Sequence, residues 1–175
     1  MMRKTICLVF VFILSILLCS CGQELSEKGS LAASCVKDLK YSLVSQRTLE
    51  LTDDITFESY LFTDDVASNS DADYDELTVI DNSAYREYII IPYAASNAMG
   101  VMIDDVAYYK VRLNESGGYG FKYIGDNDDL NDWQNIQGHK DISLFYMDRD
   151  VDSPVSTEII SAEAVAKEVG CSVNK

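Results

Sequence analysis

The sequence predicts an α+β fold, a single domain in which an antiparallel sheet is combined with short helices near the N- and C-termini. Short apolar or alternating segments recur between residues 48 and 160, and turn residues such as Thr52-Asp53-Asp54 and Gly117-Gly118 lie between them. Helical spacing occurs mainly at the two ends of the domain. Consecutive strands joined by short turns pair antiparallel, which favours this class. An all-β barrel or sandwich is the alternative.

Two terminal segments have helical character. Ser30 is a candidate N-cap, and apolar residues stand at every fourth position from Leu31 to Leu43. From Lys40 onward the same stretch also alternates like a strand, so the end of this helix is left open. Near the C-terminus, Ser161 precedes a helical segment, 162–169, and Gly170 stands where a glycine favours the end of a helix.

Strands are predicted through the centre of the chain. Segment 85–93 has the strongest signal, and Pro92 is expected to end it or to place it at an edge. Asp104-Asp105 is predicted as a turn, and 128–137 as one or two helical turns around Trp133. The predicted strands are 48–51, 55–62, 77–80, 85–93, 101–103, 106–113, 120–124, 142–147 and 158–160.

The first 21 residues differ from the rest of the chain. Basic Arg3 and Lys4 precede 13 residues, 6–18, that are apolar apart from Ser15. This length suits the apolar region of a signal peptide and falls short of the roughly 20 residues that span a bilayer. Leu18-Cys19-Ser20-Cys21 follows, so a small residue stands directly before Cys21.

This segment resembles the lipobox of bacterial lipoproteins. The resemblance covers residues 1–21 only, and it implies that Cys21 becomes the N-terminal residue, with a thioether diacylglycerol and an acylated amine. Two or more acyl chains, such as palmitate, give a stable anchor. The protein is therefore expected outside the cytoplasm, at the cell membrane or the outer membrane. A plain secretory signal or an uncleaved anchor is the alternative.

This interpretation divides the chain into a signal peptide (1–20), a lipidated cysteine with a polar tether (21–30) and one globular domain (31–175). The 155 residues that remain after cleavage are enough for an independent core. They carry 12 basic and 29 acidic residues, a net charge of −17. Such a surface repels nucleic-acid phosphates, so nucleic acid is excluded as a partner.

Two cysteines remain in the domain once the signal peptide is lost and Cys21 is lipidated. Cys35 and Cys171 are candidates for a disulfide, because exported proteins form disulfides readily. The bond would join the beginning of the domain to its end. Two separate buried thiols are the alternative.

Two acidic segments are candidates for a calcium site. Each places a carboxylate at every second residue, a spacing that suits a hard cation with oxygen ligands. Both lack the glycine and the final glutamate of an EF-hand loop, and a solvated acidic loop is the alternative. No cofactor other than calcium is expected. The residues concerned are Asp71, Asp73 and Asp75 in one segment, and Asp148, Asp150 and Asp152 in the other.

Catalytic patterns are sparse in this sequence. His139 is the only histidine, and no serine lies in a G-x-S-x-G motif. We therefore expect no catalytic residues and no enzymatic activity, with a small hydrolase as a minor alternative.

Aromatic residues supply the candidate binding site. Seven of the 11 tyrosines fall between Tyr85 and Tyr123, within predicted strands. Exposed tyrosines favour contact with proteins or sugars. The candidate site comprises Tyr88, Tyr108, Tyr119 and Trp133. We thus expect a membrane-anchored binding module for an unknown protein, peptide or glycan at the cell envelope. A calcium-stabilised adhesin or envelope structural module is the alternative.

Overall fold

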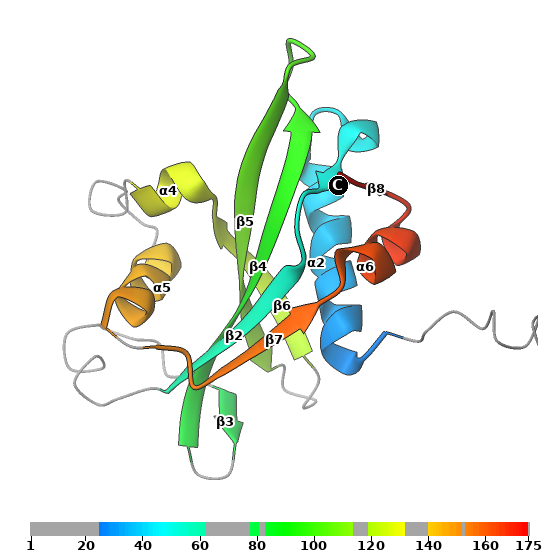
Figure 1. Ribbon diagram of the computed structural model, residues 1–175. Coiled ribbons are helices and arrows are strands. Elements are labelled where there is room, and N and C mark those ends of the chain that lie inside the picture. Colours follow the sequence, from blue (N-terminus) through cyan, green and yellow to red (C-terminus); the bar gives the residue numbers. More distant parts are fainter. Residues whose placement is uncertain are drawn as a thin grey trace, which may run out of the picture.

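An eight-stranded, mostly antiparallel sheet forms the centre of the protein, with helices on both faces (Figure 1). The computed structural model describes residues 25–61, 78–80, 83–113, 119–131, 140–151 and 153–174. The predicted α+β class is confirmed. The strands are β1 (Glu50–Leu51), β2 (Ile55–Leu61), β3 (Thr78–Ile80), β4 (Ser83–Ser96), β5 (Met102–Leu113), β6 (Tyr119–Gly125), β7 (Ser156–Ile160) and β8 (Ser172–Val173). The helices are α2 (Glu27–Ser42), the 3-10 helix η1 (Gln46–Thr48), α4 (Asn127–Asn131), α5 (Lys140–Val151) and α6 (Ala162–Val169).

The long strand β4 organises the sheet. It pairs antiparallel with β5, which in turn pairs with the edge strand β6. Along β4, residues 85–90 pair with β2 and residues 93–94 pair with β1. The C-terminal strands complete the sheet, because β7 pairs antiparallel with β2 and β8 lies parallel to β1.

Pro92 lies inside β4, so the prediction that it ends a strand or marks an edge is wrong. Its carbonyl accepts the backbone N–H of Thr52 at 3.2 Å. The nitrogen and carbonyl of a strand residue point to the same side, so the missing amide proton of Pro92 faces the turn between β1 and β2. At this position the strand beside β4 changes from β2 to β1. Pro92 therefore has no strand partner on that side, and its missing N–H removes no hydrogen bond between strands.

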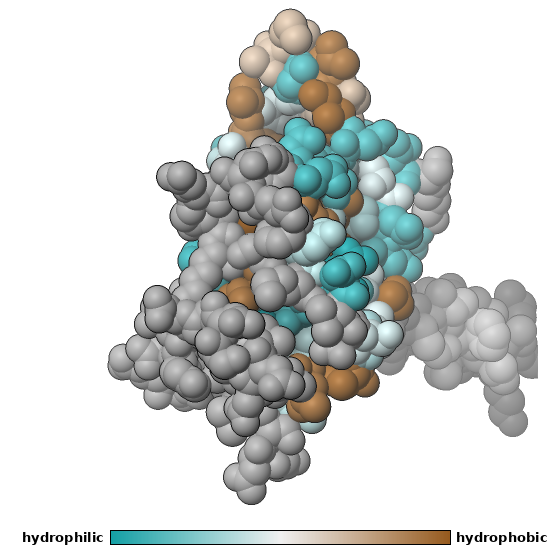
Figure 2. Space-filling view, turned by 90° about the vertical axis from the view of Figure 1, so that its left-hand side faces the viewer, coloured by the Kyte–Doolittle hydropathy of each residue, from teal (hydrophilic) through white to brown (hydrophobic). Residues whose placement is uncertain are grey.

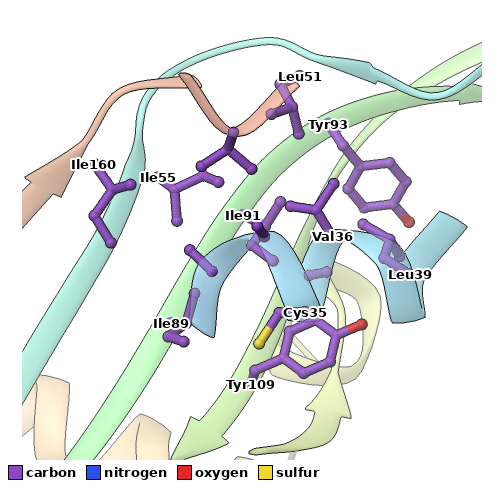
Figure 3. Close-up of a cluster of buried hydrophobic side chains, with 14 of the residues drawn as sticks. Cys35, Val36, Leu39, Leu51, Ile55, Ile89, Ile91, Tyr93, Tyr109 and Ile160 are labelled. Carbon is purple, nitrogen blue, oxygen red and sulfur yellow. The ribbon is translucent and has the colours of Figure 1, made fainter. Parts of the chain in front are cut away.

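One face of the sheet packs against α2 and α6. Odd-numbered residues of β4 and β5 point to this face, where they contact apolar side chains of α2 (Figure 3). The buried set includes Cys35, Val36, Leu39, Ile89, Ile91, Tyr93 and Tyr109. This alternation places the main core between the sheet and the terminal helices.

Helix α2 begins before the predicted N-cap. The Ser26 hydroxyl accepts the N–H of Gly29 at 3.0 Å and caps the helix. Residues 27–30 are therefore helical, and that part of the predicted tether is corrected. At the other terminus the predicted helix 162–169 is confirmed as α6, and Gly170 adopts a left-handed conformation with φ of 67°.

The opposite face of the sheet packs against α5. The prediction of a strand at 142–147 is wrong, because these residues are helical. Ile142, Phe145 and Asp148 recur at every third position, which places all three on the buried side of α5. They pack on Tyr60, Tyr88, Ile90, Tyr108 and Ile124 of the sheet.

The predicted turn at Asp104-Asp105 is also wrong, since both residues lie inside β5. The chain turns earlier, between β4 and β5, where the Asn97 side-chain oxygen accepts the N–H groups of Met99 and Val101 at 2.9 and 3.1 Å. The strands predicted at 55–62, 120–124 and 158–160 are confirmed as β2, β6 and β7 within a few residues. Helix α4 begins the helical segment predicted at 128–137, and residues 132–139 lie outside the described part of the chain.

Candidate binding surface

Two of the four aromatic residues predicted to bind a ligand are core residues. Tyr88 is 0% exposed and Tyr108 is 3% exposed. Their rings pack on Phe145 of α5, with centroid distances of 4.7 and 5.0 Å. The prediction that these tyrosines form an exposed surface is therefore wrong. Tyr88 and Ile90 of β4 and Tyr108 of β5 face α5, which covers them.

Of the other two candidates, the structure describes Tyr119 alone. Tyr119 on β6 is half-buried and packs against the core on the α2 side of the sheet. It thus lies on the opposite face from Tyr88 and Tyr108. Trp133 lies outside the described residues.

A buried polar network joins α5 to β4. Arg86 Nη1 donates to Asp148 Oδ1 at 2.7 Å, and the Tyr88 hydroxyl donates to Asp148 Oδ2 at 2.8 Å. All three residues are buried. Burial raises the pKa of Asp148, although Arg86 and Tyr88 act in the opposite direction. Both carboxylate oxygens of Asp148 are thus occupied by groups that position α5.

A second ion-pair network joins the first turn of α5 to β5 and β6. Lys110 donates to Asp141 Oδ1 at 3.1 Å, and Lys122 donates to Asp141 Oδ2 at 2.6 Å. Burial of Asp141 favours its neutral form, but the two lysines outweigh this effect and lower its pKa. Charged contacts therefore hold α5 at both ends.

The C-terminal acidic segment does not form the predicted loop. Asp148 and Asp150 lie in α5, where residues two positions apart point to different sides of the helix. Asp150 is exposed, whereas Asp148 is buried against Arg86. Asp71, Asp73, Asp75 and Asp152 lie outside the described residues. Among the residues described, no group of three or more His, Cys, Asp or Glu side chains could hold a metal ion.

Cys35 and Cys171 are free thiols, so the structure does not contain the candidate disulfide. Cys35 is buried in α2, and its burial, with a smaller effect of Asp38, raises the pKa of the thiol. Cys171 is half-buried after α6, and burial also raises its pKa. Neither environment favours the reactive thiolate. Cys21 lies outside the described residues.

Glu87 is a buried carboxyl group that the sequence did not indicate. It lies on β4 with 4% of its surface exposed. The Ser59 hydroxyl donates to Oε1 at 3.3 Å, whereas Oε2 has no hydrogen-bond partner among the described residues. Burial raises the pKa of Glu87, against the smaller effects of Lys28 and Ser59. This arrangement favours the protonated acid.

Exposed apolar side chains gather at the end of the β4–β5 hairpin. The hairpin projects beyond the rest of the sheet (Figure 1), and hydrophobic residues cover much of this end (Figure 2). Four of the ten large apolar residues that are exposed in the described part of the chain lie here. They are Met99 at 84%, Val101 at 56%, Met102 at 45% and Ile103 at 49%. We call these four residues the apolar tip.

Backbone and side-chain hydrogen bonds shape the apolar tip. Besides the two bonds to its side chain, Asn97 donates its N–H to the Val101 carbonyl at 2.9 Å and accepts the Gly100 N–H at 3.0 Å. Gly100 has φ of 79°, which only glycine adopts without strain. The apolar tip thus lies on a hydrogen-bonded turn, and its side chains are exposed to solvent. In the sequence, apolar residues stand on both sides of Gly100, and this pattern could have indicated an exposed apolar turn.

A shallow hollow of about 370 Å³ lies beside the start of α6. Asp54 borders it, and its Oδ1 accepts the N–H of Ala162 at 2.8 Å. This bond caps α6 in place of Ser161, whose side chain makes no capping bond. The contact gives Asp54 a structural role.

Comparisons with protein families, with curated proteins and with solved structures found no match to this chain. Among the helices of the described residues, none has the length and apolar character needed to cross a bilayer.

Proposed function

We propose that the protein is a lipid-anchored, extracytoplasmic binding module without enzymatic activity, and that it contacts a protein or peptide through the apolar tip. The observation that carries this proposal is the exposure of four large aliphatic or thioether side chains on a hydrogen-bonded turn. Fully burying one such side chain contributes about 1.5–3 kcal/mol. Binding of a partner would bury these four side chains, which remain exposed in the folded protein.

The chemistry of the apolar tip favours a protein or peptide over a glycan. Sugars bind mainly to aromatic faces and polar groups, whereas the tip presents methionine, valine and isoleucine. Methionine side chains adapt to irregular apolar partners. Tyr88 and Tyr108, two of the aromatic residues predicted to bind a protein, peptide or glycan, are covered by α5.

The proposed anchor is consistent with the position of the apolar tip. Helix α2 starts at the end of the domain opposite the hairpin end (Figure 1). Cys21 and Ser26 are five residues apart, so the chain between them reaches at most about 18 Å. A lipid on Cys21 would therefore keep the start of α2 near the bilayer and direct the tip away from it.

Metabolic labelling with palmitate tests the anchor. The Cys21→Ser substitution should prevent lipidation, so that the variant no longer incorporates labelled palmitate. Cys19→Ser is the matched control, because it changes a neighbouring cysteine and leaves the proposed modification site intact. Equal palmitate incorporation by the two variants would contradict the lipobox assignment.

Site-specific photocrosslinking tests the binding surface. A photoreactive residue at exposed Ala98 should give one discrete adduct in cells that export the chain. The same residue at exposed Lys167 on α6 should give none. Absence of an adduct from Ala98, or equal adducts from both positions, would contradict binding through the hairpin end.

A further inference from the structure

Five carboxylates lie beside the β5 side of the hairpin. Asp104 and Asp105 follow the apolar tip directly in β5, and the Asn127 N–H at the start of α4 donates to Asp105 Oδ1 at 3.3 Å. This bond brings the acidic residues of α4 to the same side. The set, which we call the acidic belt, comprises Asp104, Asp105, Asp126, Asp128 and Asp129.

The charge of the acidic belt is not neutralised within the described part of the chain. None of its five members makes an ion pair with a described residue, in contrast to Asp141 and Asp148. Two members of the acidic belt affect a neighbouring tyrosine. Burial raises the pKa of Tyr93, and the charges of Asp105 and Asp126 raise it further. The negative potential of the belt therefore extends to the base of the hairpin.

The other side of the hairpin base has a different character. The Ser96 N–H donates to Thr48 Oγ1 at 2.9 Å, which places η1 against β4. Exposed Arg47 belongs to this 3-10 helix. The apolar tip thus rises between a side with five carboxylates and a side that carries one cation, Arg47, and one carboxylate, Glu50.

From this arrangement we infer that the partner is a protein with an apolar pocket whose rim carries lysine or arginine where it meets the acidic belt. This inference rests on the proposed function and specifies the occupant of its binding surface. Apolar contact would supply affinity, and the complementary rim would orient the partner and speed association.

The same charges disfavour the other occupants of the apolar tip. Anionic lipid headgroups would meet the acidic belt with like charge, so a bilayer is a poor partner. A second copy of the chain, docked tip to tip, would bring two acidic belts together. A basic-rimmed protein avoids both repulsions.

Charge reversal in the photocrosslinking experiment tests this inference. Asp104 and Asp128 are exposed, and their carboxylates make no hydrogen bond within the described residues, so Asp104→Lys/Asp128→Lys should leave the fold intact. We expect this variant to reduce the adduct yield from Ala98 by about tenfold or more, as juxtaposed like charges do. The control Asp150→Lys/Glu27→Lys makes the same change of net charge at exposed carboxylates on other surfaces and should leave the yield unchanged.

The adduct identifies the occupant by its mass and by the crosslinked peptide. A partner protein whose crosslinked segment is apolar and flanked by lysine or arginine would support the inference. A charge-insensitive adduct with a protein would overturn the inference and leave the proposed function standing. An adduct with lipid or with a second copy of the chain would overturn the inference as well. No adduct at all would overturn the proposed function itself.

Discussion

Arg86 on β4 and Asp148 on α5 form a buried ion pair of 2.7 Å, although they stand 62 residues apart in the sequence. The Tyr88 hydroxyl binds the second oxygen of the same carboxylate. These contacts tie α5 to the middle of the sheet, and the tyrosines beneath it become core residues. The projecting hairpin, by contrast, carries four exposed large apolar side chains.

Removing this carboxylate should destabilise the fold strongly. Asp148→Ala is expected to lower the free energy of unfolding by about 3–5 kcal/mol, because the charge of Arg86 loses its buried counterpart. Tyr88→Phe removes one hydrogen bond to a charged group and should cost about 1.5–3 kcal/mol. Urea denaturation measures both values. Asp150→Ala, on the exposed side of α5, is the control, and an equal effect of Asp148→Ala and Asp150→Ala would refute the structural role.

The buried carboxyl of Glu87 makes a prediction about pH. Its pKa in the folded state is raised above the ordinary value of 4.5, so the folded protein takes up this proton before the unfolded chain does. Its ionisation therefore destabilises the fold at neutral pH, and this cost disappears as the pH falls through the raised pKa towards 4.5.

The variant Glu87→Gln isolates this effect. It should be more stable than the wild type at pH 7, because a neutral amide replaces a buried charge of nearly the same shape. The difference in unfolding free energy should shrink as the pH is lowered towards 4.5. A difference that stays constant across this range would show that Glu87 does not titrate as described.

The end of α6 depends on the conformation of Gly170. A Cβ at this position would meet no atom within 4 Å, so substitution acts only through the left-handed backbone, with φ of 67°. Gly170→Ala should lower the free energy of unfolding by about 1–2 kcal/mol. Gly170→Asn should cost less, because asparagine tolerates this region better. Thermal denaturation provides the comparison, and equal losses for the two variants would contradict the conformational explanation.

The free cysteines make a prediction about alkylation. In the folded protein Cys171 should react with iodoacetamide before Cys35, because Cys35 is buried and its thiolate is disfavoured. After denaturation without a reducing agent, both thiols should react. Mass spectrometry of the alkylated peptides distinguishes the two sites. A failure of both to react after denaturation would show that they are joined in a disulfide.

Local patterns account for the parts of the fold that the sequence predicts correctly. Segment 85–93 is rich in β-branched and aromatic residues, and it forms the centre of β4. Helix α6 ends at Gly170, a glycine in the left-handed conformation, and this signal depends only on neighbouring residues. Such features need no knowledge of distant contacts.

Two of the wrong predictions, the strand at 142–147 and the exposure of Tyr88, depend on contacts that are distant in the sequence. The spacing of Ile142, Phe145 and Asp148 indicates a helix only when Asp148 is known to be a buried partner of Arg86. The same contact decides that Tyr88 is covered. The wrong turn at Asp104-Asp105 has a local cause, because an Asp-Asp pair is typical of turns whereas the real turn is held by the side chain of Asn97.

The most direct test of the central claim is the adduct yield from Ala98 in the variant Val101→Ser/Ile103→Ser, measured together with its melting temperature. Both side chains are about half exposed in the folded protein, so their replacement should change the melting temperature little. We expect the variant to lose the adduct while its fold remains as stable as that of the wild type. Retention of the adduct in a stably folded variant would contradict the claim that the apolar tip binds the partner.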